Sequence, residues 1–462
     1  MTSGHDGSTF SVADAHVVVV GAARSGIAAA ELLARRGAQV TLSEARQTVD
    51  AALPRLRAAG VSVELGGHQP KTLASADLVV LSPGVSPRLP VIDEVRRRGT
   101  LVISEVELAA RWLRGRIVAV TGTKGKTTTT TLTGQMIDAD GRYALVGGNI
   151  GTALSSQVDE SAPDAIHVVE VSSFQLELTQ TFHPWIAVFL NLSPDHLDRH
   201  ASFEAYTDAK ARIFANQTSN DAMVINADDP LVLQIARRGR ARQVPFALTS
   251  PIDEGVVVSR DSVTYRSPTA EHPLVPLSAV RLPGRHLLSD VLAASAAGWV
   301  VGVSADAMTR AVSTFKGIEH ALEPVGEVDG VRFVNDSKAT NVVAARAAVE
   351  CFDWGLVVIM GGRFKGGDLS ELEPPLMARA TAVVAIGEAR EQIRTVLGSC
   401  LDIQEAETMR DAVRLAFALA RPGGTVLLAP ACASLDMFDS YADRGRVFKK
   451  EVAALAQDTP MQ

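Results

Sequence analysis

Short apolar runs alternate with amphipathic stretches along almost the whole chain. Runs such as residues 17–20, 79–81 and 356–360 are rich in Val, Leu and Ile and have the length of buried strands. Between them lie helical stretches such as residues 27–36, which stops at Gly37, a residue type that often ends helices. Because strands that alternate with helices form βαβ units, we expect an α/β protein with largely parallel sheets.

The chain is long enough for several domains. Its 462 residues exceed the roughly 250–300 at which single hydrophobic cores stop growing. The alternation falls into three blocks, which we place at residues 1–104, 105–317 and 318–462. Other expected strands lie at residues 39–43, 101–103, 331–334, 382–386 and 425–428. The second block opens with a predicted helix around residues 106–113.

Composition and charge exclude several classes of protein. Hydrophobic residues make up 47% of the chain and charged residues 21%, which is ordinary for packed globular cores. The net charge of −7 supplies no basic field, so we do not expect nucleic acid as the main partner. The three cysteines are odd in number and far apart, which indicates a reducing compartment rather than a disulfide framework.

Neither a membrane span nor a targeting segment is expected. The longest apolar stretch, residues 291–303, is shorter than the about 20 residues that a spanning helix needs, and we interpret it as a buried helix. The polar, Gly/Ser-rich N-terminus lacks the basic and apolar regions of a signal peptide. We therefore expect a cytoplasmic protein without membrane insertion, and we expect it to be a monomer.

The most informative segment is a glycine-rich loop between a strand and a helix. The run Thr121-Gly122-Thr123-Lys124-Gly125-Lys126-Thr127-Thr128 follows apolar residues 118–120 and precedes helix-compatible residues 129–137. In phosphate-binding loops, backbone N–H groups and a helix N-terminus hold phosphate oxygens, the lysine supplies charge and the hydroxyl ligates Mg²⁺. Val120 occupies the position of the first glycine in the general pattern, so this loop is a compact variant. The context favours a nucleoside triphosphate site over an ordinary turn with a surface lysine.

Two further features of the second block carry candidate metal chemistry. Glu170 ends an apolar strand, and a strand-end acid beside a phosphate loop is the usual second Mg²⁺ anchor, although a capping carboxylate would look the same. A predicted strand also runs into the loop at residues 191–198, which contains His196, either a ligand or a structural histidine. Lys210, on a helix expected at residues 203–215, is not distinguished by spacing from a solvated lysine.

The first block resembles a dinucleotide-binding unit with one departure. Gly21 and Gly26 bracket a turn directly after a strand, and Glu44 ends the next strand. Ala23 replaces the middle glycine, which disfavours close approach of a pyrophosphate and hence a nicotinamide cofactor. A Rossmann-like domain that binds another nucleotide-bearing ligand fits better, with Ser82-Pro83-Gly84 after a further strand at the ligand-binding edge.

Three polar loops of the third block each follow a predicted strand. They are residues 335–341, 361–367 and 430–436. Because the carboxyl ends of parallel strands meet at one edge of a sheet, we expect these loops to converge on one crevice. Their lysines and helix N-termini suit an anionic substrate.

These motifs together resemble the Mur ligases. The resemblance rests on the phosphate loop, Gly148-Asn149-Ile150-Gly151, Asp195-His196-Leu197-Asp198-Arg199, Lys210 and Asn335-Asp336-Ser337-Lys338. The run Pro430-Ala431-Cys432-Ala433-Ser434-Leu435-Asp436-Met437-Phe438 is similar to the branch that adds D-glutamate. The resemblance to the Mur ligases covers essentially the whole chain after its first residues.

The resemblance implies three domains: a Rossmann-like domain that binds UDP, a central P-loop mononucleotide-binding ATPase domain, and a Rossmann-like C-terminal domain that binds the amino acid. It implies an ATP-dependent ligase of peptidoglycan precursor synthesis, and hence of cell-wall biogenesis, cell shape and cell division. The carboxylate of UDP-N-acetylmuramoyl-L-alanine attacks the γ-phosphate of ATP, and the D-glutamate amine then attacks the acyl phosphate. The implied cofactor is Mg²⁺ at two sites, with ATP as co-substrate.

Residue roles are also implied by this resemblance. ATP is bound by Gly122, Thr123, Lys124, Gly125, Lys126, Thr127, Thr128, Asp290 and Asp336. One Mg²⁺ is held by Thr127 or Thr128 with Glu170, and the second by His196 and a carbamoylated Lys210; Lys126 completes the catalytic set. The UDP-substrate is bound by Arg24, Ser25, Glu44, Ala45, Ser82, Gly84, Asn149, Ser172 and Gln175. D-glutamate is bound by Lys338, Thr340, Lys365, Ser434, Leu435 and Tyr441.

The sequence departs from the family pattern at two places. Leu287 and Asp290 stand where the family commonly has two asparagines near the adenine, and Ala321 follows His320 where it commonly has an arginine that reaches ATP phosphate. Losing that contact should weaken ATP binding or slow transfer unless Arg363 or another cation replaces it. Three alternatives remain open: a ligase for another amino acid or for folate, a nicotinamide dehydrogenase, and a non-catalytic binding protein.

Overall fold

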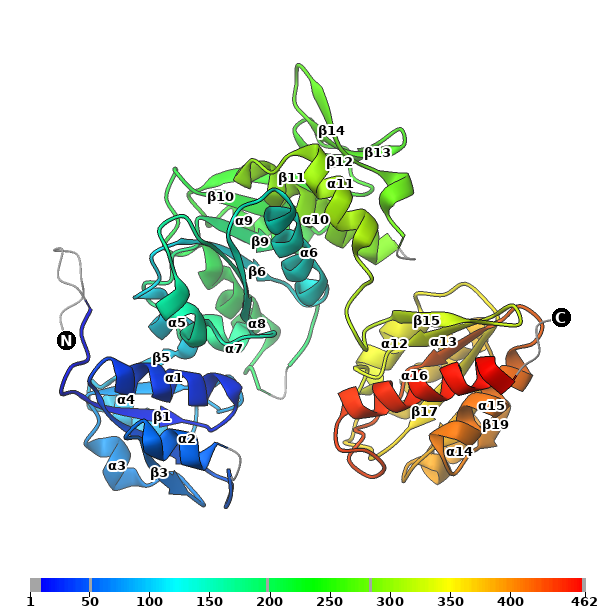
Figure 1. Cartoon of the computed structure of the whole chain (residues 1–462), viewed down its shortest axis with the longest axis horizontal. Helices are drawn as coiled ribbons and strands as arrows, with labels where there is room; N and C mark the ends of the chain where they lie inside the picture. Colours follow the sequence, from blue (N-terminus) through cyan, green and yellow to red (C-terminus); the bar gives the residue numbers. More distant parts are fainter. Residues whose placement is uncertain (1–9, 50–51, 197–198, 282–284, 459–462) are drawn as a thin grey trace. The chain divides into compact units, whose positions relative to one another are not determined.

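The described chain folds into three separate β-sheets with helices packed against them (Figure 1). The structure is a computed structural model that describes residues 10–49, 52–196, 199–281 and 285–458. The polar N-terminal residues 1–9, Leu197, Asp198 and the side chain of His286 lie outside the described set. The chain divides into two compact units, with the boundary in the chain between Phe315 and Lys316.

The first sheet is parallel throughout, as the alternating pattern predicts. Its strand order is β3-β2-β1-β4-β5. The strands are β1 (His16–Val20), β2 (Gln39–Glu44), β3 (Ser62–Leu65), β4 (Leu78–Leu81) and β5 (Leu101–Ser104). The helices are α1 (Arg24–Arg35), α2 (Leu53–Ala58), α3 (Pro70–Ala74), α4 (Pro90–Arg97) and α5 (Glu105–Ala110). Helices α2, α3 and α4 carry proline in the first turn, where the missing N–H has no intrahelical partner to lose.

The second sheet belongs to the same compact unit and has the order β14-β13-β12-β11-β10-β9-β6-β8-β7. Its strands are β6 (Arg116–Thr121), β7 (Ala144–Gly148), β8 (Ile166–Glu170), β9 (Ile186–Phe189), β10 (Ala222–Asn226), β11 (Arg242–Ala247), β12 (Gly255–Ser259), β13 (Ser262–Arg266) and β14 (Glu271–Pro276). Its helices are α6 (Lys126–Ala139), α7 (Ser173–Leu176), α8 (Phe203–Ala211), α9 (Pro230–Ala236), α10 (Arg285–Val301) and α11 (Ala305–Thr314). Short 3₁₀ turns lie at Leu154–Glu160, Arg212–Phe214 and Leu277–Ala279.

The third sheet forms the second unit, with the order β15-β16-β20-β17-β18-β19. Its strands are β15 (Glu323–Val328), β16 (Val331–Asn335), β17 (Leu356–Gly361), β18 (Ala380–Ile386), β19 (Ile403–Glu405) and β20 (Thr425–Leu428). Its helices are α12 (Val342–Val349), α13 (Glu373–Arg379), α14 (Arg390–Leu397), α15 (Met409–Ala420) and α16 (Tyr441–Asp458), with a 3₁₀ turn at Leu369–Leu372.

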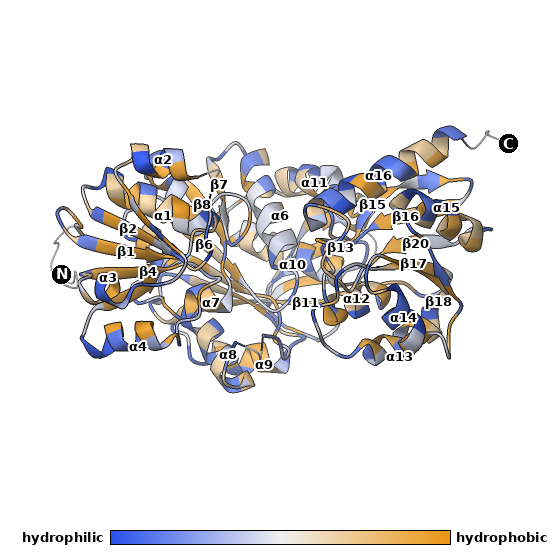
Figure 2. Cartoon of the chain, turned by 90° about the horizontal axis from the view of Figure 1, so that it is seen from below, coloured by the Kyte–Doolittle hydropathy of each residue, from blue (hydrophilic) through white to orange (hydrophobic). Residues whose placement is uncertain are grey.

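The inner strands of each sheet are buried because they are apolar on both faces, whereas edge strands such as β3, β14 and β15 are partly exposed. Figure 2 shows the hydrophobic colour concentrated in strands such as β1, β6 and β17, while helices carry hydrophilic residues as well. Every residue of β4, β9 and β20 is buried. Helix α10 confirms the predicted buried helix and begins earlier than expected. Among the described residues, no helix is long and apolar enough to cross a bilayer.

The prediction of largely parallel sheets is confirmed, with antiparallel exceptions at two edges. Strands β12, β13 and β14 pair antiparallel at one end of the central sheet, and β15 pairs antiparallel with β16. These strands are joined by tight connections rather than helices. The helices expected at residues 106–113 and 203–215 end earlier, at Ala110 and Ala211.

Candidate active site

The phosphate loop lies at the carboxyl end of β6, between β9 and β8 in the second sheet. β6 ends at Thr121 and α6 begins at Lys126, so the loop points its backbone at a helix N-terminus. Gly125 has φ of +80°, and a Cβ there would lie 2.1 Å from Oδ1 of Asp290. This position therefore requires glycine, both for its backbone conformation and for the close approach of α10.

The side chain of Asn191 binds the backbone of the loop. Its Oδ1 accepts hydrogen bonds from the N–H groups of Thr123 (3.1 Å) and Lys124 (2.8 Å). Nζ of Lys126 donates to the carbonyl oxygens of Gly122 (3.0 Å) and Thr123 (2.8 Å), so its charge lies over the loop. A cation and a helix N-terminus at one place form an anion site.

Glu170 and Thr127 meet beside the loop, as predicted. Oγ1 of Thr127 donates to Oε2 of Glu170 at 2.7 Å, and Nδ2 of Asn149 donates to Oε1 of the same carboxylate at 2.8 Å. Glu170 is 2% exposed and lies at the end of β8, which pairs with β6 in parallel. A hydroxyl and a carboxylate are hard oxygen ligands of the kind that Mg²⁺ prefers. Thr128 lies in the same first helical turn.

Lys210, in α8, also contacts the loop. Its Nζ donates to the carbonyl oxygen of Gly122 at 2.7 Å and lies 4.9 Å from the ring centroid of Tyr206. The side chain is 2% exposed, and burial lowers its pKa well below the usual range, with the charge of Lys126 acting in the same direction. An amine in this environment is driven toward its neutral, nucleophilic form.

His196 is half exposed and lies on the rim of this region. Its Nε2 is 3.6 Å from Oδ2 of Asp195, and its ring centroid is 4.9 Å from that of Phe174. Within the described ranges, no group of three or more His, Cys, Asp and Glu residues could hold a metal ion. This is compatible with Mg²⁺, which commonly takes one or two protein ligands and keeps its waters. The pairing of His196 with Lys210 at one metal stays a prediction.

Asp290 contacts the loop from α10. It is 7% exposed, and burial raises the pKa of its carboxyl well above the usual range, against the opposing effects of Thr129 and of the charge of Lys126. The structure thus brings Asp290 to the phosphate loop. Its contact with ATP stays a prediction.

The residues predicted to bind a UDP-substrate come from both sheets of the first unit. Nη2 of Arg24 donates to the carbonyl oxygen of Asn149 at 3.1 Å, which joins the first loop of one sheet to the edge of the other. Oγ of Ser82 donates to the carbonyl oxygen of Gly21 at 2.8 Å. Oε2 of Glu44 accepts the N–H of Ala22 at 2.6 Å. The contact between Ser82 and Gly21 places the turns after β1 and β4 at the same edge of the first sheet.

Some of the remaining residues predicted to bind the UDP-substrate make hydrogen bonds within the protein. Ser172 and Gln175 form a capping box at the start of α7, while Nε2 of Gln175 is buried and has no partner among the described residues. An unpaired buried donor is costly unless a ligand or water satisfies it. Ser25 lies in α1, and both Ala45 and Gly84 are exposed.

In the second unit, the three loops converge as predicted. The N–H of Gly361 donates to Pro430 O, the N–H of Ala431 donates to Ala339 O, and Arg363 pairs with Ala433 through the backbone. The predicted D-glutamate residues lie on or beside these loops: Lys338, Thr340, Lys365, Ser434, Leu435 and Tyr441. The side chains of Leu435 and Tyr441 are 62% and 42% exposed. Their role stays a prediction.

Arg444, which no sequence pattern singles out, connects these loops. It is fully buried in α16, and its guanidinium donates to Oγ and O of Ser337, to O of Gly361 and to O of Cys432. Burial lowers its pKa to about 10. A buried guanidinium therefore lies behind loops that also carry Lys338 and Lys365.

Asp336 lies in the same loop region and is 8% exposed. Burial raises the pKa of its carboxyl to about 7, while the N–H of Leu322 (3.2 Å from Oδ1) and the charge of Lys338 act against this. A carboxyl held near neutrality at a loop edge is typical of functional sites.

Family models match three segments of the chain: the Mur ligase MurD-like N-terminal domain over residues 15–104, the Mur ligase middle domain over residues 120–298, and the Mur ligase glutamate ligase domain over residues 322–432. The chain belongs to the Mur ligase family. Proteins named UDP-N-acetylmuramoylalanine--D-glutamate ligase match it at 47% identity in Acidobacterium capsulatum, over 95% of this chain and 96% of the relative. The corresponding protein of Koribacter versatilis is 42% identical over 96% and 98%.

Solved structures of Mur ligases share the fold. UDP-N-acetylmuramate-alanine ligase from Thermotoga maritima matches with a TM-score of 0.59 at 19% identity, over 96% of this chain and all of that chain. A pseudomurein peptide ligase from Methanothermus fervidus matches with a TM-score of 0.57 at 17% identity, over 96% and 100%. At these identities the likeness concerns the fold, and it confirms the three-part α/β architecture predicted from the Mur ligase resemblance.

Proposed function

We propose that this Mur ligase adds D-glutamate to UDP-N-acetylmuramoyl-L-alanine, with hydrolysis of ATP to ADP and phosphate, in peptidoglycan precursor synthesis. The observation that carries the proposal is the pairing of Thr127 with Glu170 at 2.7 Å beside the phosphate loop, in a chain whose relatives bear the name of that activity over nearly their full length. The proposal includes a cytoplasmic location and a monomeric state.

The reaction needs an activated carboxylate, because a carboxylate is a poor acyl donor. A carboxylate oxygen of the substrate attacks the γ-phosphorus of ATP, the bond to the bridging oxygen breaks, and ADP leaves. The amine of D-glutamate then attacks the acyl carbon, phosphate leaves, and the amine loses a proton. Lys126, already placed over the loop by its bonds to Gly122 and Thr123, offsets the negative charge on the phosphates during transfer.

Mg²⁺, when bound, neutralises charge on the phosphoryl group and orients it. In the proposal, Thr127 and Glu170 hold one ion, and His196 and Lys210 serve a second. The lowered pKa of Lys210 supports its carbamoylation, because the neutral amine is the form that reacts with carbon dioxide and the product offers carboxylate-like oxygens. Carbon-13 NMR after equilibration with labelled bicarbonate should show a carbamate signal that Lys210→Arg lacks.

In this proposal the two units bind different substrates. The first unit binds UDP-N-acetylmuramoyl-L-alanine through the contacts around Arg24, Asn149 and Ser82, and Gln175 offers its unpaired Nε2. The second unit binds the carboxylates of D-glutamate through its two loop lysines. We place the domain boundaries after residues 104 and 317.

The test is phosphate release from Mg-ATP with UDP-N-acetylmuramoyl-L-alanine, in the presence and absence of D-glutamate, with mass detection of the product. We expect turnover only with both substrates and a product heavier by one glutamyl residue. L-glutamate, other amino acids and a folate acceptor should not replace the two substrates. Turnover with another amino acid would keep the family and refute the substrate, and turnover by a folded Glu170→Gln variant at the wild-type rate would refute the proposed metal role.

A further inference from the structure

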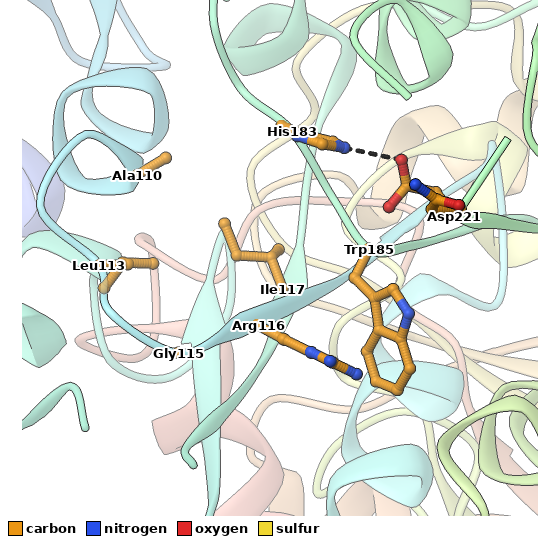
Figure 3. Close-up of a pocket in the computed structure, with 9 residues that line it drawn as sticks. Ala110, Leu113, Gly115, Arg116, Ile117, His183, Trp185 and Asp221 are labelled. Carbon is orange, nitrogen blue, oxygen red and sulfur yellow. Dashed lines mark hydrogen bonds and ion pairs between the residues drawn. The ribbon is translucent and has the colours of Figure 1, made fainter. Parts of the chain in front are cut away.

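A cavity lies in the first unit at the edge of the central sheet opposite the phosphate loop. Its volume is about 410 Å³, within the range of small-molecule sites. Figure 3 shows Arg116, the first residue of β6, and Trp185, just before β9, in its lining. The phosphate loop follows the other, carboxyl end of β6. A molecule bound here would not compete with ATP at the loop.

The walls of this cavity combine an apolar part with polar side chains. Figure 3 shows Ala110, Leu113, Ile117 and the indole of Trp185 around it. The guanidinium carbon of Arg116 lies 4.5 Å from the centroid of the Trp185 ring, so the cation stacks on the indole and is held there. Stacking uses the face of the guanidinium and leaves its N–H edge available.

Arg116 has no hydrogen bond or ion pair through its side chain with any residue that the structure describes. The acidic residue of the cavity lining, Asp221, already has hydrogen-bond partners within the protein. Its Oδ2 accepts hydrogen bonds from His183 Nε2 (2.8 Å) and from N and Oγ1 of Thr218 (2.7 and 2.9 Å), and it is 8% exposed. Burial acts to raise the pKa of Asp221, but these bonds more than offset it and hold the pKa below its usual range.

We propose that this cavity binds a small organic anion with a flat apolar body and one carboxylate or phosphate group. The anionic group accepts hydrogen bonds from the guanidinium edge of Arg116, and the body packs against Leu113, Ile117 and the indole. The hydrogen-bond balance supports an anion, because the carboxylate of Asp221 already accepts hydrogen bonds from His183 and Thr218, whereas the guanidinium of Arg116 has no such partner among the described residues. A neutral apolar molecule would leave the guanidinium donors facing it unused.

The test uses the full chain labelled with 5-fluorotryptophan and fluorine NMR. The chain has four tryptophans, and the signal lost in Trp185→Phe identifies Trp185. The probes are 2-naphthoate and the uncharged 2-naphthamide, which share the flat body. We expect 2-naphthoate to shift the Trp185 signal in a saturable manner and to bind at least about tenfold more tightly than the amide, as charge-assisted hydrogen bonds predict.

Two variants distinguish binding in the cavity from a general effect of positive surface charge. Arg116→Gln should abolish the preference for naphthoate over naphthamide, whereas Arg114→Gln, at an exposed arginine outside the cavity lining, should keep it. Saturating ATP should leave the affinity unchanged. An unmoved Trp185 signal, equal binding of the two probes, equal loss in both variants or displacement by ATP would each overturn the proposal.

Discussion

Replacing Asp336 by asparagine should stabilise the second unit, and increasingly so as the pH rises. The carboxyl is 8% exposed, and burial raises its pKa to about 7 from the ordinary value of 3.8. The folded state therefore binds this proton more tightly than the unfolded state does. Asparagine has nearly the same shape, keeps an oxygen for the N–H of Leu322 and carries no charge to desolvate.

The sign and size follow from proton linkage. Below pH about 4 the carboxyl is protonated in both states and carries no penalty. Between the unfolded pKa and about pH 7 only the unfolded state ionises, so the free energy of unfolding falls by about 1.4 kcal/mol for each pH unit. The full penalty is about 4 kcal/mol above pH 7, and about 2 to 3 kcal/mol of it develops between pH 5 and pH 8.

Calorimetric unfolding of the wild type and Asp336→Asn at pH 5, 6.5 and 8 measures this difference, because other titrating groups cancel between the two proteins. For a unit of this size, about 1 kcal/mol shifts Tm by roughly 2–4 °C, so the advantage of the variant should grow by roughly 5–10 °C over this range. Asp439→Asn, at an exposed position, is the control and should show a constant difference. A constant difference for Asp336→Asn as well would refute the reasoning.

Three further outcomes are expected. Glu107→Ala should destabilise the first unit by about 3–5 kcal/mol in urea unfolding, because its buried carboxylate pairs with Arg111 and accepts the N–H groups of residues 180–182; an effect below about 1 kcal/mol would contradict this. Lys126→Met should lower phosphate release at least about a hundredfold, while Lys71→Met, at an exposed lysine away from the phosphate loop, should not; equal rates for Lys126→Met and the wild type would show that the charge of Lys126 plays no part in transfer. Arg444→Met should lower the Tm of the second unit and raise the KM for D-glutamate more than it changes the KM for ATP, and equal changes would argue against loop fastening.

The phosphate loop was predictable because its residues are adjacent in the sequence. Glu170 was predictable because the sheet topology brings the ends of neighbouring parallel strands together. Lys126 and Thr127 sit in one short run, and Glu170 follows from the rule that parallel strands end at one edge. Lys210 was not predictable from spacing, because its acceptor Gly122 lies 88 residues away in the chain. Only the resemblance to the family pointed to it.

Arg444 was missed for a related reason. In an amphipathic helix such as α16, an arginine is most simply interpreted as a surface cation. Apart from the hydroxyl of Ser337, its acceptors are backbone carbonyls of three loops, and these carry no sequence signal. The antiparallel edge strands were also missed, since short strands such as β12 and β13 lack the intervening helix on which the βαβ prediction depends.

The direction of the pKa shift distinguishes buried ionisable groups that are held in the charged form from those that are shifted to the neutral form. Glu107 is buried with its partners, which hold its pKa below the usual range despite desolvation, as expected for a group that supports the fold. The pKa values of Lys210, Asp290 and Asp336 are shifted toward the neutral forms by burial that their partners offset only in part, so each group weakens the folded state at neutral pH. All three lie beside loops at the carboxyl ends of parallel strands. A group that costs stability at such a place is best explained by a ligand that it meets.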